Sequence, residues 1–301
     1  MIEFWDTSHR EGMNAMFSSW IGINPSIEVK PTIPDYVYID KINSLLDQAH
    51  SYIREFRTII KVNNKYIFMD AVDRPVLAAE SYKVPFDLIC KFQFDPTPGA
   101  YAHSIAPVVP FTYTLRKYNM DFIYKNRELR KEIMNNKQFT SSIYWGGGMK
   151  SNRHVRRKLR HSLTVQAKKA ICATLGYDDY MKMMATTLAG VAVSGRGDFC
   201  YRDIELAGMG TPFFRQSFAN ITRNPRIPNI HYYSINGGLQ QTLQHYINYF
   251  EPNGELRNFT PEEWDKHCEI SNNSMKWFDE NSSPEGSFKV FCEILEENNI
   301  I

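Results

Sequence analysis

SGRGDFCYRDIELAGMGTPFFR, residues 194–215, contains the pattern that decides the fold. The apolar run Gly190–Ser194 before it predicts a strand, and glycines follow at once. Tyr201–Met209 then predicts a helix, and Thr211–Arg215 predicts a second strand. Strands that alternate with helices over short connections are typical of a parallel sheet covered by helices. This part of the chain is therefore predicted to be α/β.

Three charged residues stand on this turn and on the helix that it opens. Arg202 and Glu205 are three positions apart, so they share a helix face near its N-terminus, and Arg196 lies in the turn itself. A guanidinium there can hold a phosphate, and a carboxylate one turn later can accept hydrogen bonds from ribose hydroxyls. The alternative is a surface ion pair within the helix, worth only about 0.3–0.5 kcal/mol. The surrounding glycines favour a site for a diphosphate and a ribose.

A second glycine-rich turn lies in IYWGGGMKSNRHVRR, residues 143–157. An apolar strand leads into it and a basic helix is predicted to follow, so backbone N–H groups can approach an anion. The residues expected to contact that anion are Gly147, Lys150, Arg153 and Arg157. The spacing of a Walker A loop is absent. The alternative is an ordinary turn followed by a solvated basic helix.

The whole chain is predicted to form two α/β domains of Rossmann type that face each other across a cleft. The boundary is expected near residue 138, with one domain over 1–138 and a second over 139–301. In the first domain, strands are expected at Tyr66–Met69 and at Phe86–Asp95.

Other segments carry weaker signals. Residues 96–114 are interrupted by prolines and predict a long loop, and residues 125–137 predict a charged helix or a linker. The aspartates of YDDY, 177–180, precede a predicted helix and are interpreted as N-capping residues rather than as a metal-binding motif.

Composition and charge exclude several classes of function. A net charge of +2 argues against a dedicated nucleic-acid binder, and five scattered cysteines without a CxxC pair argue against a disulfide framework or a zinc site. The histidines show no metal-ligand spacing, and no GxSxG nucleophile motif is present. No apolar run approaches the length of a membrane span, and no signal peptide is visible. We expect a cytoplasmic protein without a metal or a cofactor.

These motifs together resemble a known family. SGRGD, RDIE and GMGTPFF, with the segments 143–157 and 90–113, are similar to nucleotide-sugar glycosyltransferases of the GT-B fold. Within them, the chain is most similar to the exostosin-like group and to short enzymes of large algal viruses, which include xylosyltransferases; a viral enzyme would work in the host cytoplasm. The resemblance covers about residues 66–215 and is strongest over 190–215. It implies an acceptor-side domain over 1–138 and a nucleotide-sugar-binding domain with closing C-terminal helices over 139–301. It also implies that Arg202 contacts the diphosphate of a sugar donor and Glu205 its ribose.

A base that accepts the proton of an acceptor hydroxyl is expected on the acceptor side. FMDAVDRP, residues 68–75, ends a predicted buried strand, and we expect Asp73 to be this base while Asp70 caps the loop. Asp6 and His9 in WDTSHR are the alternatives. A retaining mechanism would need no such base.

The resulting hypothesis is a metal-independent, inverting glycosyltransferase. It would move a sugar from a UDP donor, with UDP-xylose as the specific candidate, to a hydroxyl of a glycan. A GDP-sugar is the alternative donor. A catalytically inactive module that binds a glycan or a nucleotide is the alternative from another class. An RNA-binding role for residues 151–161 is disfavoured because the basic charge is confined to that segment.

Overall fold

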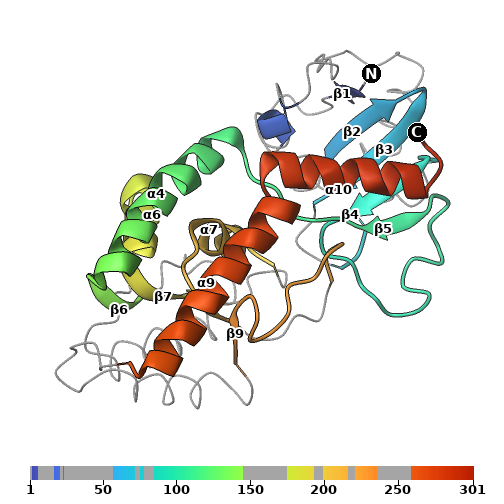
Figure 1. Ribbon diagram of the computed structural model, residues 1–301. Helices are drawn as coiled ribbons and strands as arrows, with labels where there is room; N and C mark the ends of the chain where they lie inside the picture. Colours follow the sequence, from blue (N-terminus) through green and yellow to red (C-terminus); the bar gives the residue numbers. More distant parts are fainter. Residues whose placement is uncertain are drawn as a thin grey trace. The chain divides into compact units, whose positions relative to one another are not determined.

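The structure is a computed structural model (Figure 1). It describes residues 2–5, 17–20, 23, 57–71, 75–77, 85–144, 175–192, 199–215, 221–235 and 259–301. The chain divides into two compact units. Unit 1 consists of Met1–Lys117, Ala219–Pro225 and Glu280–Ile301, and unit 2 consists of Tyr118–Phe218 and Arg226–Asp279.

Among the described residues, unit 1 contains a mixed sheet of five strands in the order β1-β2-β3-β4-β5. Its strands are β1 (Ile2–Trp5), β2 (Arg57–Val62), β3 (Lys65–Asp70), β4 (Leu88–Lys91) and β5 (Val108–Pro110). The first three strands pair antiparallel, whereas β3, β4 and β5 pair parallel. The parallel half therefore presents the carboxyl ends of β3, β4 and β5 at one edge.

The hairpin between β2 and β3 follows from its turn residues. Asn63 and Asn64 both have positive φ, 50° and 67°, and Val62 pairs with Lys65 across the turn. Two central residues of positive φ match the right-handed twist of the flanking strands, and asparagine tolerates this conformation better than most residues. The two asparagines thus set the register of the sheet.

Aromatic side chains fill the core of unit 1. Trp20 ends the short 3-10 helix η1 (Ser18–Trp20) and is fully buried. Its ring lies 5.3 Å from that of Phe291 on α10 (Pro284–Glu297), and its Nε1 donates to Ser287 Oγ at 2.8 Å. The last helix of the chain therefore packs in the core of the unit that contains the first strand.

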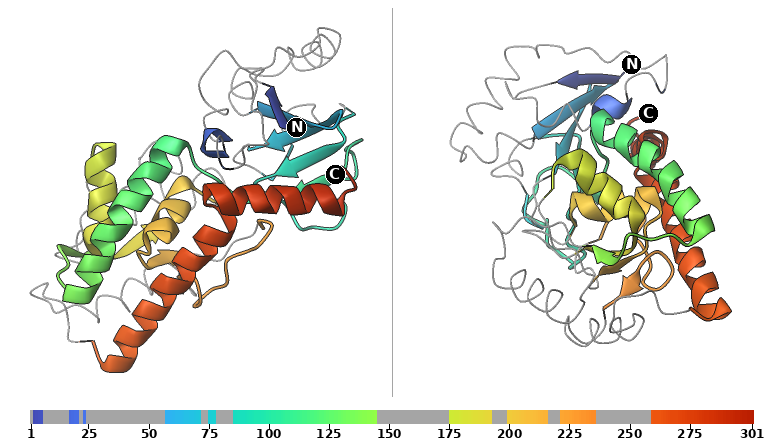
Figure 2. Two further views of the ribbon diagram at one scale, coloured as in Figure 1. Left: turned by 45° about the horizontal axis from the view of Figure 1, so that its top comes forward. Right: turned by 90° about the vertical axis from the view of Figure 1, so that its left-hand side faces the viewer.

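Unit 2 contains a parallel sheet in the order β6-β7-β8-β9. Its strands are β6 (Ser141–Tyr144), β7 (Thr187–Ala192), β8 (Phe213–Arg215) and β9 (Tyr233–Ser234). The helices that the structure describes here are α4 (Lys117–Asn136), α6 (Tyr177–Thr186), α7 (Tyr201–Met209) and α9 (Pro261–Asn281). α6 precedes β7 directly and α7 connects β7 to β8, so strands and helices alternate as predicted. α4 and α6 run side by side in both views of Figure 2.

Helix α7 lies unusually close to its neighbours because small residues form the contacts. A Cβ atom on Gly190 of β7 would lie 2.6 Å from Leu206 Cδ2. A Cβ on Gly208 would lie 2.8 Å from Ile123 Cγ2 and 2.9 Å from Phe278 Cε2. The absence of a Cβ atom at these two glycines therefore allows α7 to pack directly on the sheet and on α4 and α9.

Helix α4 buries a basic residue. Arg130 is 1% exposed, and its guanidinium donates to the carbonyl oxygens of Ala185 at 3.2 Å, Leu188 at 3.0 Å and Thr187. These carbonyls belong to the last turn of α6 and the start of β7, where the helix dipole favours a cation. Burial lowers the pKa of Arg130 to about 9. This arginine thus ties α4 to the sheet in place of an apolar side chain.

The α/β class with parallel sheets is confirmed, and the strands expected at 66–69, 86–95, 190–194 and 211–215 correspond to β3, β4, β7 and β8. Other expectations need correction. The predicted loop 96–114 contains β5, and the charged segment 125–137 belongs to a 20-residue helix. Asp178 and Asp179 lie in the first turn of α6, whose N-cap is Gly176. The compact units divide the chain after residue 117, and residues 280–301 join unit 1. The division of the chain into folding domains over residues 1–138 and 139–301 remains a prediction.

Candidate functional site

The candidate site is in unit 2, on the first turns of α7. Parallel pairing with β6 and β8 places the end of β7 at the carboxyl edge of the sheet, where ligands of open α/β sheets bind. α7 begins at Tyr201, after the end of β7, and the first turn of α6 carries Tyr177 and Tyr180, whose hydroxyl groups contact Glu205 of α7. The N-termini of both helices therefore lie toward that same edge.

The structure brings Arg202 and Glu205 together through a tyrosine rather than in a direct ion pair. Arg202 Nε donates to Tyr180 Oη at 3.2 Å, and Tyr180 Oη donates to Glu205 Oε2 at 2.8 Å. Tyr177 Oη donates to the other carboxylate oxygen, Oε1, at 2.8 Å. Asn119 Nδ2, at the start of α4, donates to Tyr177 Oη. Two tyrosines therefore bond the carboxylate directly, and Arg202 and Asn119 each bond one of these tyrosines.

The burial of these groups controls their ionisation. Glu205 is only 4% exposed, and burial raises its pKa, while the hydrogen bonds from Tyr180 and Tyr177 and the charge of Arg202 oppose that rise. Burial also raises the pKa of both tyrosines, and the adjacent carboxylate raises it further. Tyr177 and Tyr180 therefore stay protonated and act as hydrogen-bond donors.

Aromatic rings surround the two tyrosines. The ring of Tyr180 lies 6.0 Å from that of Tyr144 at the end of β6 and 5.9 Å from that of Tyr177. The Tyr177 ring lies 5.7 Å from Tyr118 and 5.5 Å from Phe122. These contacts fix the direction of both hydroxyl groups toward Glu205.

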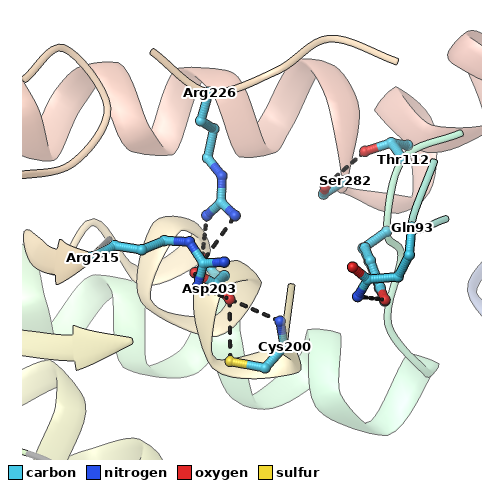
Figure 3. Close-up of polar contacts among 8 residues, drawn as sticks. Gln93, Thr112, Cys200, Asp203, Arg215, Arg226 and Ser282 are labelled. Carbon is cyan, nitrogen blue, oxygen red and sulfur yellow. Dashed lines mark hydrogen bonds and ion pairs between the residues drawn. The ribbon is translucent and has the colours of Figure 1, made fainter. Parts of the chain in front are cut away.

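A buried charge cluster anchors the start of α7 (Figure 3). Asp203 is fully buried; its Oδ2 accepts from the backbone N–H of Cys200 at 2.8 Å and its Oδ1 lies 2.8 Å from Arg215 Nη1. Arg226 donates from Nη1 to the backbone carbonyl of Asp203 at 2.8 Å, with its Nη2 3.7 Å from the carboxylate. This cluster ties α7 to the end of β8. Since Asp203 lies between Arg202 and Glu205, it also fixes where these two side chains leave the helix.

Most predicted site residues lie outside the described residues. On the donor side these are Gly147, Lys150, Arg153, Arg157 and Arg196, and on the acceptor side they are Asp73, Asp6 and His9. Their roles remain predictions. Asp70, considered as a loop cap beside Asp73, is described: it is fully buried at the end of β3, and its Oδ1 lies 3.1 Å from Lys91 Nζ at the end of β4.

Sequence reasoning missed Tyr177, Tyr180 and Asn119. The signal was present in YDDY, because its two tyrosines are three positions apart and share a helix face. Among the residues that the structure describes, no group of three or more His, Cys, Asp or Glu could hold a metal ion. Across the same ranges no helix is long and apolar enough to cross a membrane.

Comparison with known proteins gives structural likenesses alone. No family model matches the chain, and no curated protein matches its sequence. Anabaena HepE in complex with UDP is similar with a TM-score of 0.46 and 9% identity, over 70% of this chain and 64% of that one. A glycosyltransferase from Rickettsia africae is similar with a TM-score of 0.42 and 12% identity, over 70% and 63%. The pneumococcal O-GlcNAc transferase GtfA, in complex with UDP and GlcNAc, has a TM-score of 0.37 and 13% identity, over 75% and 49%.

The chain thus spans less than two thirds of the length of these structures. TM-scores below 0.5 at such low identity do not assign a function to it.

Proposed function

We propose that the chain is a glycosyltransferase that moves a sugar from a nucleoside-diphosphate donor to a hydroxyl of a glycan. The observation that carries the proposal is the arrangement of Arg202, Tyr180 and Glu205 at the N-terminus of α7. A helix N-terminus and a guanidinium attract a diphosphate, and a carboxylate one turn along accepts hydrogen bonds from ribose hydroxyls. Both chemical groups of a nucleoside diphosphate are therefore matched on one helix.

The finer features of the proposal come from the sequence. UDP is the proposed nucleotide, UDP-xylose the proposed donor and GDP the alternative nucleotide, by resemblance to the exostosin-like and algal viral enzymes. The segment 143–157 is proposed to add positive charge around the diphosphate, which would stabilise the leaving group without a metal. Asp73 is proposed as the base of an inverting transfer, and the cytoplasm as the location.

Donor binding tests the proposal. The thermal midpoint of the protein is measured with UDP, GDP, CDP and UDP-sugars, each with and without EDTA, because a ligand that binds only the folded state raises the midpoint. We expect a shift with UDP that EDTA does not change. No shift with any nucleotide would overturn the proposal. A shift with UDP without sugar transfer to any glycan would favour the catalytically inactive binding module.

Substitutions on α7 test the site itself. Arg202→Ala and Glu205→Gln should each weaken UDP binding about 10- to 100-fold, the loss of one hydrogen bond to a charged group. The matched control is Lys266 and Glu269 on α9, which have the same spacing and form an exposed ion pair of 2.8 Å. Lys266→Ala and Glu269→Gln should leave UDP affinity unchanged. Equal affinities in all four variants would refute the site.

A further inference from the structure

We propose that His267 is an acid-sensitive switch: its protonation in mildly acidic solution releases the first two turns of α9, residues 261–267, while the rest of unit 2 stays folded. His267 contacts Tyr233 at the start of β9, and the start of β7 lies beside it. This is the amino edge of the sheet, opposite to the candidate site. The inference is therefore independent of the proposed function.

The first two turns of α9 pack on unit 2 through a single buried side chain. Within residues 261–267 only His267 is buried, at 2% exposure. The second half of the helix differs, because buried residues recur in each of its turns. They are Ile270, Ser271, Ser274, Trp277, Phe278 and Asn281. Since segments with few buried contacts open at a lower free energy than well-packed ones, the start of α9 can open by itself.

The surroundings of His267 suit a neutral imidazole. Its Nδ1 lies 3.0 Å from Tyr233 Oη. Its ring is stacked with those of Trp264, at 5.7 Å and 26°, and Tyr233, at 6.1 Å and 24°. The other ring nitrogen, Nε2, is buried and has no hydrogen-bond partner among the described residues. A neutral imidazole carries one N–H donor, and on Nδ1 that donor has an acceptor in Tyr233.

A proton on the second nitrogen destroys this match. The imidazolium has an N–H donor on each nitrogen, and Tyr233 Oη can accept only from Nδ1. The carbonyl of Leu188 favours the charged form, but it already accepts from Arg130 Nη2 at 3.0 Å. A buried N–H group without an acceptor of its own costs free energy. The closed conformation therefore disfavours the protonated ring.

Positive charge on α4 and just after it opposes protonation as well. Arg130 is 1% exposed, and its partners in the described part of the chain are carbonyl oxygens and an aromatic ring rather than a carboxylate. Lys137 Nζ lies 4.6 Å from the centre of the Trp264 ring that stacks on His267. A charged His267 would thus add a second buried cation beside Arg130.

Neither α9 itself nor β9 compensates for that charge. Burial raises the pKa of the Cys268 thiol, which therefore stays neutral, Asp265 is exposed, and β9 contributes only the Tyr233 hydroxyl. Burial lowers the pKa of His267 to about 3, and the charge of Arg130 lowers it further. In the open segment the ring regains its ordinary pKa of 6.5. The proton thus binds the open form, and each pH unit below 6.5 favours opening about tenfold.

Hydrogen–deuterium exchange on the full chain tests the switch. Between pH 7 and pH 5 the opening constant of the amides of 264–270, corrected for intrinsic exchange, should rise roughly 25-fold. At pH 5 these amides should also exchange at least about tenfold faster than those of 274–281, because the second half of α9 stays packed. Equal protection of the two halves at pH 5 would overturn the proposal, since α9 would then open only with the whole unit.

Substitutions separate the imidazole from ordinary fraying of a helix end. His267→Gln cannot take up a proton, so it should abolish the rise between pH 7 and pH 5. His103→Gln, at an exposed position in the loop before β5, is the matched control and should keep the rise. Tyr233→Phe removes the partner of Nδ1, so it should raise the opening constant at pH 7 about two- to tenfold and keep the pH dependence. A rise that persists in His267→Gln would contradict the proposal.

The wild type alone decides the matter if His267→Gln does not fold. Its opening constant should rise about tenfold per pH unit between pH 6 and pH 4, as the uptake of one proton requires. The imidazole resonances of His267 in the folded chain should remain those of a neutral ring at pH 5. An opening constant that does not rise, or a His267 that titrates near pH 6.5 in the folded chain, would overturn the inference.

Discussion

Replacing Asp203 by asparagine tests whether the buried charge cluster holds α7 in place. The substitution keeps the shape of the side chain and an oxygen that can accept from the Cys200 N–H, but it removes the negative charge. Asp203 and Arg215 are 0% and 1% exposed, and Arg226 is 3% exposed. Two guanidinium groups would then lie beside a neutral amide in a site with little water.

The expected cost follows from that burial. Removal of one partner from a buried ion pair costs about 3–5 kcal/mol, because the other ion loses that attraction while it stays buried. Asp203→Ala should cost a further 0.5–2 kcal/mol or so, since it also removes the acceptor for Cys200 at the helix start. Unit 2 has 101 residues in 118–218 and 54 in 226–279, 155 in total. At about 2–4 °C per kcal/mol for a domain of this size, the Asn variant should melt roughly 6–20 °C lower.

The assays are thermal unfolding for the melting temperature and urea unfolding for the free energy. Both are followed by circular dichroism and by tryptophan fluorescence, since Trp277 lies 4.8 Å from the Arg226 guanidinium. Glu269→Gln is the control, because its exposed ion pair with Lys266 should be worth less than about 1 kcal/mol. A loss below about 1 kcal/mol in Asp203→Asn would refute the reasoning. It would mean that the cluster is well solvated in the folded chain.

Two further predictions concern the same unit. Burial lowers the pKa of His267 from 6.5 to about 3, so between these values the unfolded chain takes up a proton that the folded chain does not. Stability should therefore fall as the pH drops below 6.5, by about 2 kcal/mol at pH 5, and His267→Gln should remove this slope in urea titrations at pH 5 and 7. Gly208→Ala should destabilise by about 1–3 kcal/mol in the same assay, because the new Cβ meets Ile123 and Phe278. Gly176→Ala, with open space around it, should cost less, about 1 kcal/mol or below, because it changes only the N-cap of α6; equal effects of both substitutions would contradict the packing argument.

The sequence analysis predicted those helices and strands for which the local sequence pattern and the tertiary packing favour the same structure. Tyr201–Met209 was expected as a helix and is α7 with the same bounds, since apolar periodicity and flanking glycines point to the same ends. β7 and β8 were found because buried parallel strands are continuous apolar runs. The structure places Arg202 and Glu205 in one hydrogen-bonded group through Tyr180, while their expected roles toward a diphosphate and a ribose remain predictions.

The failures have physical causes. The charged segment 125–137 has few apolar residues, so it does not show the apolar periodicity of a packed helix. Arg130 contacts the neighbouring elements instead, through hydrogen bonds to carbonyls of α6 and β7. β5 was missed because prolines usually end strands, although Pro110 occupies the edge strand of the sheet, where proline is tolerated. The role of Tyr177 depends on contacts between helices separate in sequence.

The three-segment composition of unit 1 has a consequence for how the chain is made. Trp20 and Ser287 are hydrogen-bonded across 267 positions of sequence. At roughly 5–20 residues per second, synthesis leaves the first segment without its final helix for about 13–53 s. During that interval the indole has no α10 to cover it, and such transiently exposed apolar surface is prone to aggregate. A chain that ends before residue 280 would lack α10, so that helix could never cover the Trp20 indole. A premature stop codon near the end of the message would therefore disturb the packing of the N-terminal segment.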